Sequence, residues 1–208
     1  MEHTDRRTGG LRHVARDAAR QRLSDVALDL FAERGFDAVT IEQIAEGAGI
    51  SARSVHRYFA AKEDMVIGLF DANGEFVRDA LLDRPADESV LTSMHAAYAA
   101  LLEQGPHRAR DRLALRLLTT TPSLRARNAE KHLRWAELLT PIIAERLDGA
   151  DTELRAHVLV QAGITAFQLA LMAWADDPQD RPMLELLDVA FHDLRGLTTD
   201  DGVAVRTT

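Results

Sequence analysis

Apolar and polar positions recur along residues 26–48 with the spacing of two amphipathic helices. The first helix ends at Gly35, where a left-handed residue closes a helix, and its apolar positions are Val26, Leu28, Leu30 and Phe31. Thr40 and Gln43 form a T-x-x-Q capping box that opens the second helix. Gly49 ends this helix after two turns, and its apolar face consists of Ile41, Ile44, Ala45 and Ala48.

A third short helix is predicted from Ala52 to Phe59, with Ser51 as its N-cap. The three residues Gly49, Ile50 and Ser51 therefore connect two short helices. This spacing is typical of a helix-turn-helix, in which the second helix enters the major groove of DNA.

The remaining chain predicts further helices and has no alternating apolar runs of the kind that form strands. A linking helix is expected over 63–82, with Val66, Phe70, Val77 and Leu81 on one stripe. Five more helices are expected over 87–104, 108–120, 124–148, 152–176 and 182–196. Asp87 and Thr152 suit N-caps, and Pro182 suits a first turn. The predicted fold class is all-α, with about nine helices and an N-terminal helix-turn-helix.

The N-terminal residues carry a specific resemblance to a known family. The series is Ala27, Leu30, Phe31, Gly35, Phe36, Thr40, Ile44, Ala45, Ala48, Gly49, Ser51, Tyr58, Phe59, Lys62 and Glu63. It resembles the DNA-binding domain of TetR/AcrR-type one-component transcriptional regulators over about residues 20 to 70. Two positions depart from the family pattern: His56 stands where an aromatic residue is usual, and Ala61 where a serine commonly caps the next helix.

The resemblance implies a division of the chain into three parts. Residues 1–62 would form an N-terminal arm and the DNA-binding domain, 63–82 the linking helix, and 83–208 a ligand-binding and dimerisation domain. In the family the last two helices form the four-helix bundle of a dimer. The interface expected here comprises Phe167, Leu171, Trp174, Leu184, Leu187 and Phe191.

Composition is consistent with a cytoplasmic protein that has a packed core. The 208 residues are 46% apolar, contain no cysteine, and begin without the apolar segment of a signal peptide. The net charge of −8 belongs mainly to the C-terminal part: residues 1–65 carry 10 basic against 11 acidic side chains, and the rest 15 against 22. The basic residues expected to gather on one surface are Arg6, Arg7, Arg12, Arg16, Arg20, Arg22, Arg53, Arg57 and Lys62, and such a local field attracts phosphates.

Residues 156–175 form a twenty-residue stretch without a formal charge, which is long enough to span a bilayer. His157, Gln161, Thr165 and Gln168 lie within it and would be expensive in hydrocarbon. We therefore expect a buried helix, covered by the core on one face and a partner subunit on the other, and no membrane partner.

The DNA contacts are expected on the third helix and its flanks, because Val55 and Phe59 point at the core. Arg53 or Arg57 can form a bidentate contact with guanine, Ser54 can reach a base edge or phosphate, and His56 lies on the same face. Further contacts are expected from Thr40, Ser51, Lys62 and, by the resemblance, Tyr58. Each of these side chains could instead be a solvated or capping group.

Polar residues within apolar runs of the C-terminal part are candidates for lining a ligand pocket. They are His95, Tyr98, Arg116, His132, Trp135, Gln161, Thr165 and Gln168, which could also satisfy one another or lie at a dimer interface. The histidines lack metal-ligand spacing, and no nucleotide-binding or hydrolase motif is found. No metal, cofactor or enzymatic activity is therefore expected.

The sequence is best explained by a homodimeric regulator, most simply a repressor, bound to a pseudo-palindromic double-stranded DNA operator. A small hydrophobic or amphipathic effector would move the linking helix and release the DNA. Two alternatives stay open: a constitutive, ligand-independent DNA-binding protein, and a helical-pocket enzyme or carrier with a vestigial head. The last of these gives Arg53, Arg57 and Lys62 no role.

Overall fold

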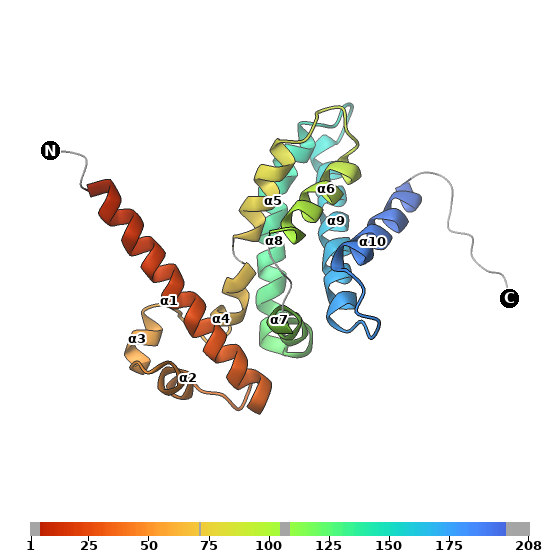
Figure 1. Ribbon diagram of the computed structural model, residues 1–208. Helices are drawn as coiled ribbons and strands as arrows, with labels where there is room; N and C mark the ends of the chain where they lie inside the picture. The colour runs from red at the N-terminus through yellow and green to blue at the C-terminus, as the bar shows by residue number, and fades with distance from the viewer. Residues whose placement is uncertain (1–4, 71, 105–108, 199–208) are drawn as a thin grey trace.

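The computed structural model describes residues 5–70, 72–104 and 109–198, and the described part is entirely helical (Figure 1). The side chains of residues 5–14, 109 and 198 lie outside the description. The elements are α1 (Asp5–Arg34), α2 (Ile41–Ala48), α3 (Ala52–His56), α4 (Asp64–Ile67), the 3-10 turn η1 (Gly68–Phe70), α5 (Asn73–Leu82), α6 (Val90–Leu102), α7 (Ala109–Thr120), α8 (Pro122–Ala144), α9 (Thr152–Ala175) and α10 (Met183–Thr198). The all-α prediction is confirmed.

Helices α1 to α3 form a small head at one end of the molecule (Figure 1). Gly35 and Gly49 have φ values of 81° and 70°, so each closes its helix in the left-handed conformation, as predicted. The Thr40–Gln43 capping box opens α2, and the Ser51 hydroxyl accepts from Ser54 N to cap α3. The third helix is shorter than predicted and ends at His56. Its last turn tightens, because the Tyr58 and Phe59 N–H groups both donate to the Val55 carbonyl.

The predicted linking helix over 63–82 is interrupted. It consists of α4, η1 and α5, with α5 beginning at Asn73. Gly68 and Gly74 are poor helix formers near the break, and the caps of α4 and α5 make no side-chain hydrogen bond. Ala61 has no hydroxyl with which to cap the next helix, α4. Its own N–H instead donates to Asp64 Oδ2 at 3.0 Å.

The helices of the body begin or end a few residues from the predicted bounds. Helix α6 is capped by Ser89 rather than Asp87, and α9 begins after Asp151, which adopts the left-handed conformation in place of the predicted Thr152 cap. Pro122 opens α8 at its first turn, and Pro141 lies within the last turn of that helix. Pro182 immediately precedes α10.

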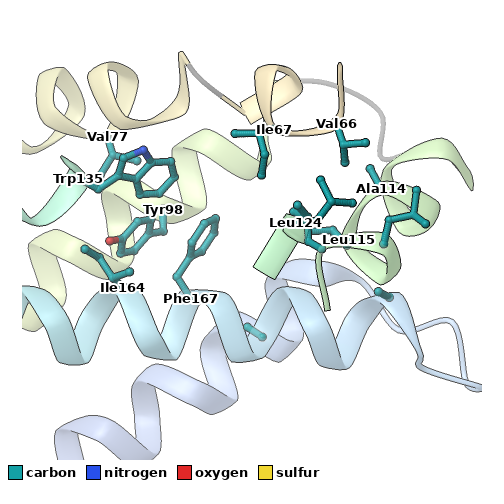
Figure 2. Close-up of a cluster of buried hydrophobic side chains, with 14 of the residues drawn as sticks. Val66, Ile67, Val77, Tyr98, Ala114, Leu115, Leu124, Trp135, Ile164 and Phe167 are labelled. Carbon is teal, nitrogen blue, oxygen red and sulfur yellow. The ribbon is translucent and has the colours of Figure 1, made fainter. Parts of the chain in front are cut away.

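Helix α9 is the central element of the body, in contact with α6, α7, α8 and α10. Among the described helices it alone has the length and mean hydropathy, 1.6, to cross a membrane. Its inner face packs against aromatic side chains: Phe167 stacks on Tyr98 with ring centres 4.4 Å apart, and Trp135 lies next to them (Figure 2). The outer face of α9 carries exposed leucine and valine side chains.

Candidate DNA-binding surface and ligand pocket

Helix α3 presents two arginines to solvent. Arg53 and Arg57 are exposed with His56 between them, whereas Val55 and Phe59 are buried in the core of the head. This division follows from the four-residue spacing of the two apolar side chains, which keeps them on one face. The exposed face therefore carries guanidinium and imidazole groups suited to phosphate oxygens and to guanine edges.

The hydroxyl-bearing residues Thr40, Ser51 and Ser54 take part in the caps of α2 and α3. Thr40 Oγ1 accepts from Gln43 N at 3.3 Å, and Gln43 Oε1 accepts from Thr40 N at 3.0 Å. The Ser51 and Ser54 hydroxyl oxygens lie 2.9 Å apart. Thr40 and Ser51 are also exposed, so their capping role leaves the side chains within reach of a phosphate.

Tyr58 connects α3 to α1. Its carbonyl accepts from the Arg20 guanidinium at 2.7 Å, and that guanidinium lies 4.6 Å from the centre of the Phe59 ring. The Arg57 guanidinium stacks over the Tyr58 ring at 5.2 Å. Arg16 and Arg57 line one hollow beside Tyr58. These contacts bring Arg16, Arg20 and Arg57 to one side of the head; the side chains of Arg6, Arg7 and Arg12 lie outside the described residues.

Lys62 has a structural role that the sequence did not indicate. Its ammonium donates to the Phe36 carbonyl at 2.8 Å and to the Val39 carbonyl at 3.1 Å, and it lies 4.4 Å from the centre of the Phe36 ring. The side chain is thus turned toward the loop before α2 rather than extended into solvent. Its contact with DNA stays a prediction.

Two adjoining hollows lie next to the break between η1 and α5 and share part of their lining. An outer groove of about 470 Å³ is lined by Gln21, Leu69, Phe70, Asn73, Leu101, Leu102, Gln104, Asp111, Leu115, Phe167, Leu171 and Met183. An inner chamber of about 30 Å³ is lined by Phe70, Asn73, Leu115, Leu118, Thr119, Asn128, Lys131, His132, Trp135, Phe167, Gln168, Leu171 and Met172. Both share the side chains of Phe70, Asn73, Leu115, Phe167 and Leu171, so these five residues separate the chamber from the groove.

Four of the eight predicted pocket residues lie at or behind the chamber. His132, Trp135 and Gln168 line it, and the fully buried Tyr98 stacks against its Phe167 wall (Figure 2). Burial, together with the adjacent Lys131 charge, lowers the pKa of His132 to about 4, so the imidazole is neutral near pH 7. Burial also raises the pKa of Tyr98, whose hydroxyl has no hydrogen-bond partner among the residues that the structure describes.

The other four predicted pocket residues, His95, Arg116, Gln161 and Thr165, do not line either of these hollows. His95 Nε2 is 2.7 Å from Asp188 Oδ1, between α6 and α10. Arg116 donates to the Ala175 carbonyl and to Asp176 at the end of α9. Thr165 is exposed and donates to the Gln161 carbonyl on the outer side of α9. Helical periodicity alone did not reveal which faces of α6, α7 and α9 point inward.

Asn128 and Lys131 are chamber residues that the sequence analysis missed. Both are more than nine-tenths buried, on the α8 face that also carries Leu124, Trp135 and Leu139. The Lys131 ammonium lies 4.9 Å and 5.3 Å from the ring centres of Trp135 and Phe70, and Asn128 Oδ1 has no hydrogen-bond partner within the described part of the chain. An amide and a lysine at core positions of an apolar helix face were the available signal.

Most residues of the predicted dimer interface are buried within the core of this single chain. Phe167, Trp174, Leu187 and Phe191 are buried, Leu171 is half-buried, and Leu184 alone of the six is exposed. The apolar side chains that are more than half exposed on α9 and α10 are Leu154, Val158, Leu169, Val189 and Leu197. The predicted helices carry an exposed apolar surface, but on their opposite faces.

Two family models match the chain. The model described as bacterial regulatory proteins, tetR family, matches residues 23–69, and the model described as MftR C-terminal domain matches residues 85–198.

Among the described residues no cluster of three or more His, Asp or Glu side chains could hold a metal ion.

Three similar proteins are described as transcriptional regulators or repressors. The mycofactocin biosynthesis transcriptional regulator MftR of Mycobacterium tuberculosis is 30% identical over 173 residues, which cover 81% of this chain and 85% of that protein. The HTH-type transcriptional regulator TcmR of Streptomyces glaucescens is 33% identical over 69% of this chain and 66% of its own. The crystal structure of Thermus thermophilus FadR in complex with lauroyl-CoA superposes with a TM-score of 0.52 at 25% identity, over 91% of this chain and 97% of that one.

Proposed function

Because this chain belongs to the TetR family of bacterial transcriptional regulators, we propose that it is a homodimeric repressor released from a pseudo-palindromic operator by a small effector. Regulators of this family bind DNA and are not enzymes. The alternative of an enzyme or carrier with a vestigial head therefore falls away. A protein that acts on DNA is expected in the cytoplasm.

The observation that carries the DNA-binding part of the proposal is the exposed face of α3. Arg53 and Arg57 lie one helical turn apart, and the buried side chains of Val55 and Phe59 hold the helix against the head. We assign base contacts to these two arginines and to His56, and phosphate contacts to Thr40, Ser51, Ser54 and Tyr58. Arg16 joins this set because it shares a hollow with Arg57.

The outer groove and the inner chamber support an effector site. Together they have apolar and aromatic walls with polar groups both in the groove (Gln21, Gln104, Asp111) and in the chamber, and such a mixed lining is usual in a small-molecule site. Thermus thermophilus FadR, a protein of the same fold, is in complex with lauroyl-CoA, an amphipathic molecule. We propose a hydrophobic or amphipathic effector for this chain as well.

The position of the two hollows suggests how the effector acts on DNA binding. Phe70 and Asn73 line both hollows and flank the break between η1 and α5, and Gln21 of α1 lines the groove. A ligand that separates Phe70 from Phe167 would shift α4, which contacts both α1 and α8. Such a ligand lowers operator affinity only to the extent that it binds the released state more tightly than the DNA-binding state. A tenfold drop in operator affinity requires a difference of about 1.4 kcal/mol between these two ligand-binding free energies.

The exposed apolar faces of α9 and α10 support the homodimer. The two helices pack side by side (Figure 1), and in each the exposed leucines and valines lie opposite the core-facing side chains. On α9 the positions Leu154, Val158, Gln161, Thr165 and Leu169 follow one another at three- and four-residue spacing, which makes a continuous stripe. A two-fold axis would pair this stripe with its copy.

The proposal is tested by selection of binding sites from a pool of random DNA sequences at low salt. We expect enrichment of a symmetric site whose half-sites lie one helical turn apart, and affinity that falls steeply with salt. Arg53→Ala or Arg57→Ala should cost about 1–3 kcal/mol and relax the preference at one base position in each half-site.

The control is Arg125→Ala, which removes an exposed arginine from α8 that does not line the hollow shared by α8 with Arg20 and Tyr58. It should leave both the enriched site and the affinity unchanged. If the wild-type protein enriches no symmetric site, the proposal is wrong. If a site is enriched but operator affinity responds to no ligand that occupies the groove, the constitutive DNA-binding alternative is correct.

A further inference from the structure

The inner chamber contains an unpaired hydrogen-bond acceptor that the fold itself does not use. Asn128 is 7% exposed, and its Oδ1 atom has no partner among the described residues. Leaving a buried polar atom without a partner costs free energy, and such atoms in native proteins often belong to a binding site. A ligand that brings an O–H or N–H donor into the chamber would recover this cost.

Apart from Lys131, the other described side chains around the chamber are uncharged. Thr119, His132 and Gln168 are uncharged hydrogen-bonding groups, and no Asp or Glu is found among the described side chains that line it. The pKa of His132, lowered to about 4 by burial and by Lys131, keeps the imidazole neutral between pH 5 and 8. Lys131 itself lies against the faces of Phe70 and Trp135.

The dimensions limit what can enter. A volume of about 30 Å³ has room for roughly two water molecules, so the chamber admits a small end group rather than a whole molecule. The adjoining groove of about 470 Å³ can hold an apolar body, and the rings of Phe70 and Phe167 lie between the two. A deprotonated carboxylate of similar size offers no donor to the unpaired oxygen, and among the described lining residues only Lys131, whose ammonium lies against Phe70 and Trp135, could attract its charge.

We propose that the inner chamber receives the hydroxyl end of an apolar effector, and that this hydroxyl donates a hydrogen bond to Asn128 Oδ1. The apolar body of the effector then occupies the groove between Phe70 and Phe167. The inference rests on the proposed function only in treating the occupant as an effector, because binding to the chamber can be measured without DNA.

Calorimetric titration with three matched probes tests the inference on the full-length protein. The probes are 2-naphthol, naphthalene and naphthalene-2-carboxylate, which share one ring system and differ in the end group. We expect 2-naphthol to bind about tenfold more tightly than either of the others, the usual effect of one hydrogen bond to a buried, otherwise unpaired group.

The variant Asn128→Leu removes the acceptor while keeping a side chain of similar shape. It should bind 2-naphthol and naphthalene with equal affinity, and its Tm should be no lower than that of the wild type, because a buried unpaired atom is lost. Thr140→Val is the matched control: Thr140 Oγ1 is also buried and unpaired but does not line the chamber. This variant should keep the tenfold preference.

Three results would overturn the inference: no binding of any probe, tighter binding of the carboxylate, or an unchanged 2-naphthol preference in a folded Asn128→Leu protein. Operator selection gives an independent answer. A chain that selects an operator but shows one of these results refutes the inference alone, whereas a chain that binds 2-naphthol as expected but selects no operator refutes the proposed function alone.

Discussion

Lys62 ties the start of α4 to the loop that precedes α2. Its ammonium donates to the carbonyls of Phe36 and Val39, which belong to the connection between α1 and α2. Because both acceptors are main-chain atoms, the contact fixes the path of the backbone rather than the rotamer of another side chain. Lys62 therefore couples the head to the helical segment that leads into the body.

We expect Lys62→Met to lower the free energy of unfolding by about 1–3 kcal/mol, because two charge-assisted hydrogen bonds are lost and two carbonyls lose a partner. The measurement is the midpoint of urea unfolding at constant slope. Arg53→Met removes an exposed cation from α3 and should change stability by less than about 0.5 kcal/mol. Equal midpoints for Lys62→Met and the wild type would show that the contact contributes nothing.

The lowered pKa of His132 leads us to expect that the stability of the fold depends on pH. Its pKa in the folded protein is about 4, below the ordinary 6.5, so between these values the unfolded chain binds more protons than the folded one. Stability is therefore complete above pH 6.5 and declines as the pH falls toward 4. The shift corresponds to a loss of up to about 3 kcal/mol across this window.

The variant His132→Gln should remove this slope, and the test is the difference in unfolding free energy between variant and wild type from pH 4 to 7. Glu88 also titrates in acid, since its hydrogen bonds with Arg84 and Ser93 lower its pKa to about 2. Its stabilising effect is lost as the pH falls from 4.5 toward 2, below the His132 window. A slope that persists in His132→Gln would assign the dependence to another group.

Helix α5 packs its backbone directly against an aromatic wall of the chamber. A Cβ atom added to Gly74 would lie 2.6 Å from Trp135 Nε1 and 2.7 Å from Trp135 Cδ1. Glycine is poor at forming helices, yet here it permits a contact that any side chain would block. The interrupted linking segment is thus held to α8 by a contact with the same indole that lines the chamber.

Gly74→Ala should destabilise the protein by about 1–3 kcal/mol, because the displacement of the indole outweighs the better helix propensity of alanine. The tryptophan fluorescence should change as well. Gly196→Ala in α10 is the matched control, since nothing lies within 4 Å of its added Cβ, and it should stabilise by about 0.5–1 kcal/mol. Similar stability changes for the two variants would contradict the close packing of α5 on Trp135.

Assembly of the whole molecule depends on the outer faces of α9 and α10. Val158→Glu or Leu169→Glu introduces a charge into the exposed apolar stripe without touching the core. We expect the dimer Kd to rise about a hundredfold or more, equal to about 3 kcal/mol, with loss of operator binding. Sedimentation at micromolar concentration measures the first effect, and a DNA mobility assay measures the second.

Two control variants distinguish a loss of dimerisation from a loss of folding. Leu133→Glu places the same charge on an exposed leucine of α8 and should leave the dimer intact. Leu187→Glu, on a fully buried residue, should instead unfold the protomer. A wild-type chain that sediments as a monomer at this concentration would contradict the proposed interface altogether.

The end of α1, both ends of α2 and the start of α3 could be predicted because their signals are local, whereas the start of α1 at Asp5 and the end of α3 at His56 were not. The Thr40–Gln43 capping box, the left-handed glycines Gly35 and Gly49, and the Ser51 cap each act within four residues of the chain. Local hydrogen bonds and backbone sterics decide such features without reference to the rest of the fold. The same signals misplaced the caps of α6 and α9, where Asp87 and Thr152 competed with the adjacent Ser89 and Asp151.

The candidate site was predicted less completely, and the misses share one cause. Tyr98, His132, Trp135 and Gln168 were expected at a pocket and lie at or behind the chamber, whereas His95 and Arg116 were expected there and lie at other contacts. Asn128 and Lys131 were not expected at all. A polar residue in an apolar helix has the same pattern whether it faces a cavity, another helix or solvent.

By itself, the sequence determined the helical class, the order of the helices, the helix-turn-helix of the head and the family. These features depend on short-range spacing and on motifs carried by contiguous residues. The tertiary structure alone decided which face of each body helix is buried. Helix α9 is apolar around most of its circumference, so periodicity could not tell the buried Phe167 from the exposed Leu169. Only packing against α6, α7, α8 and α10 makes that choice, because burial is a property of neighbours that are distant in the chain.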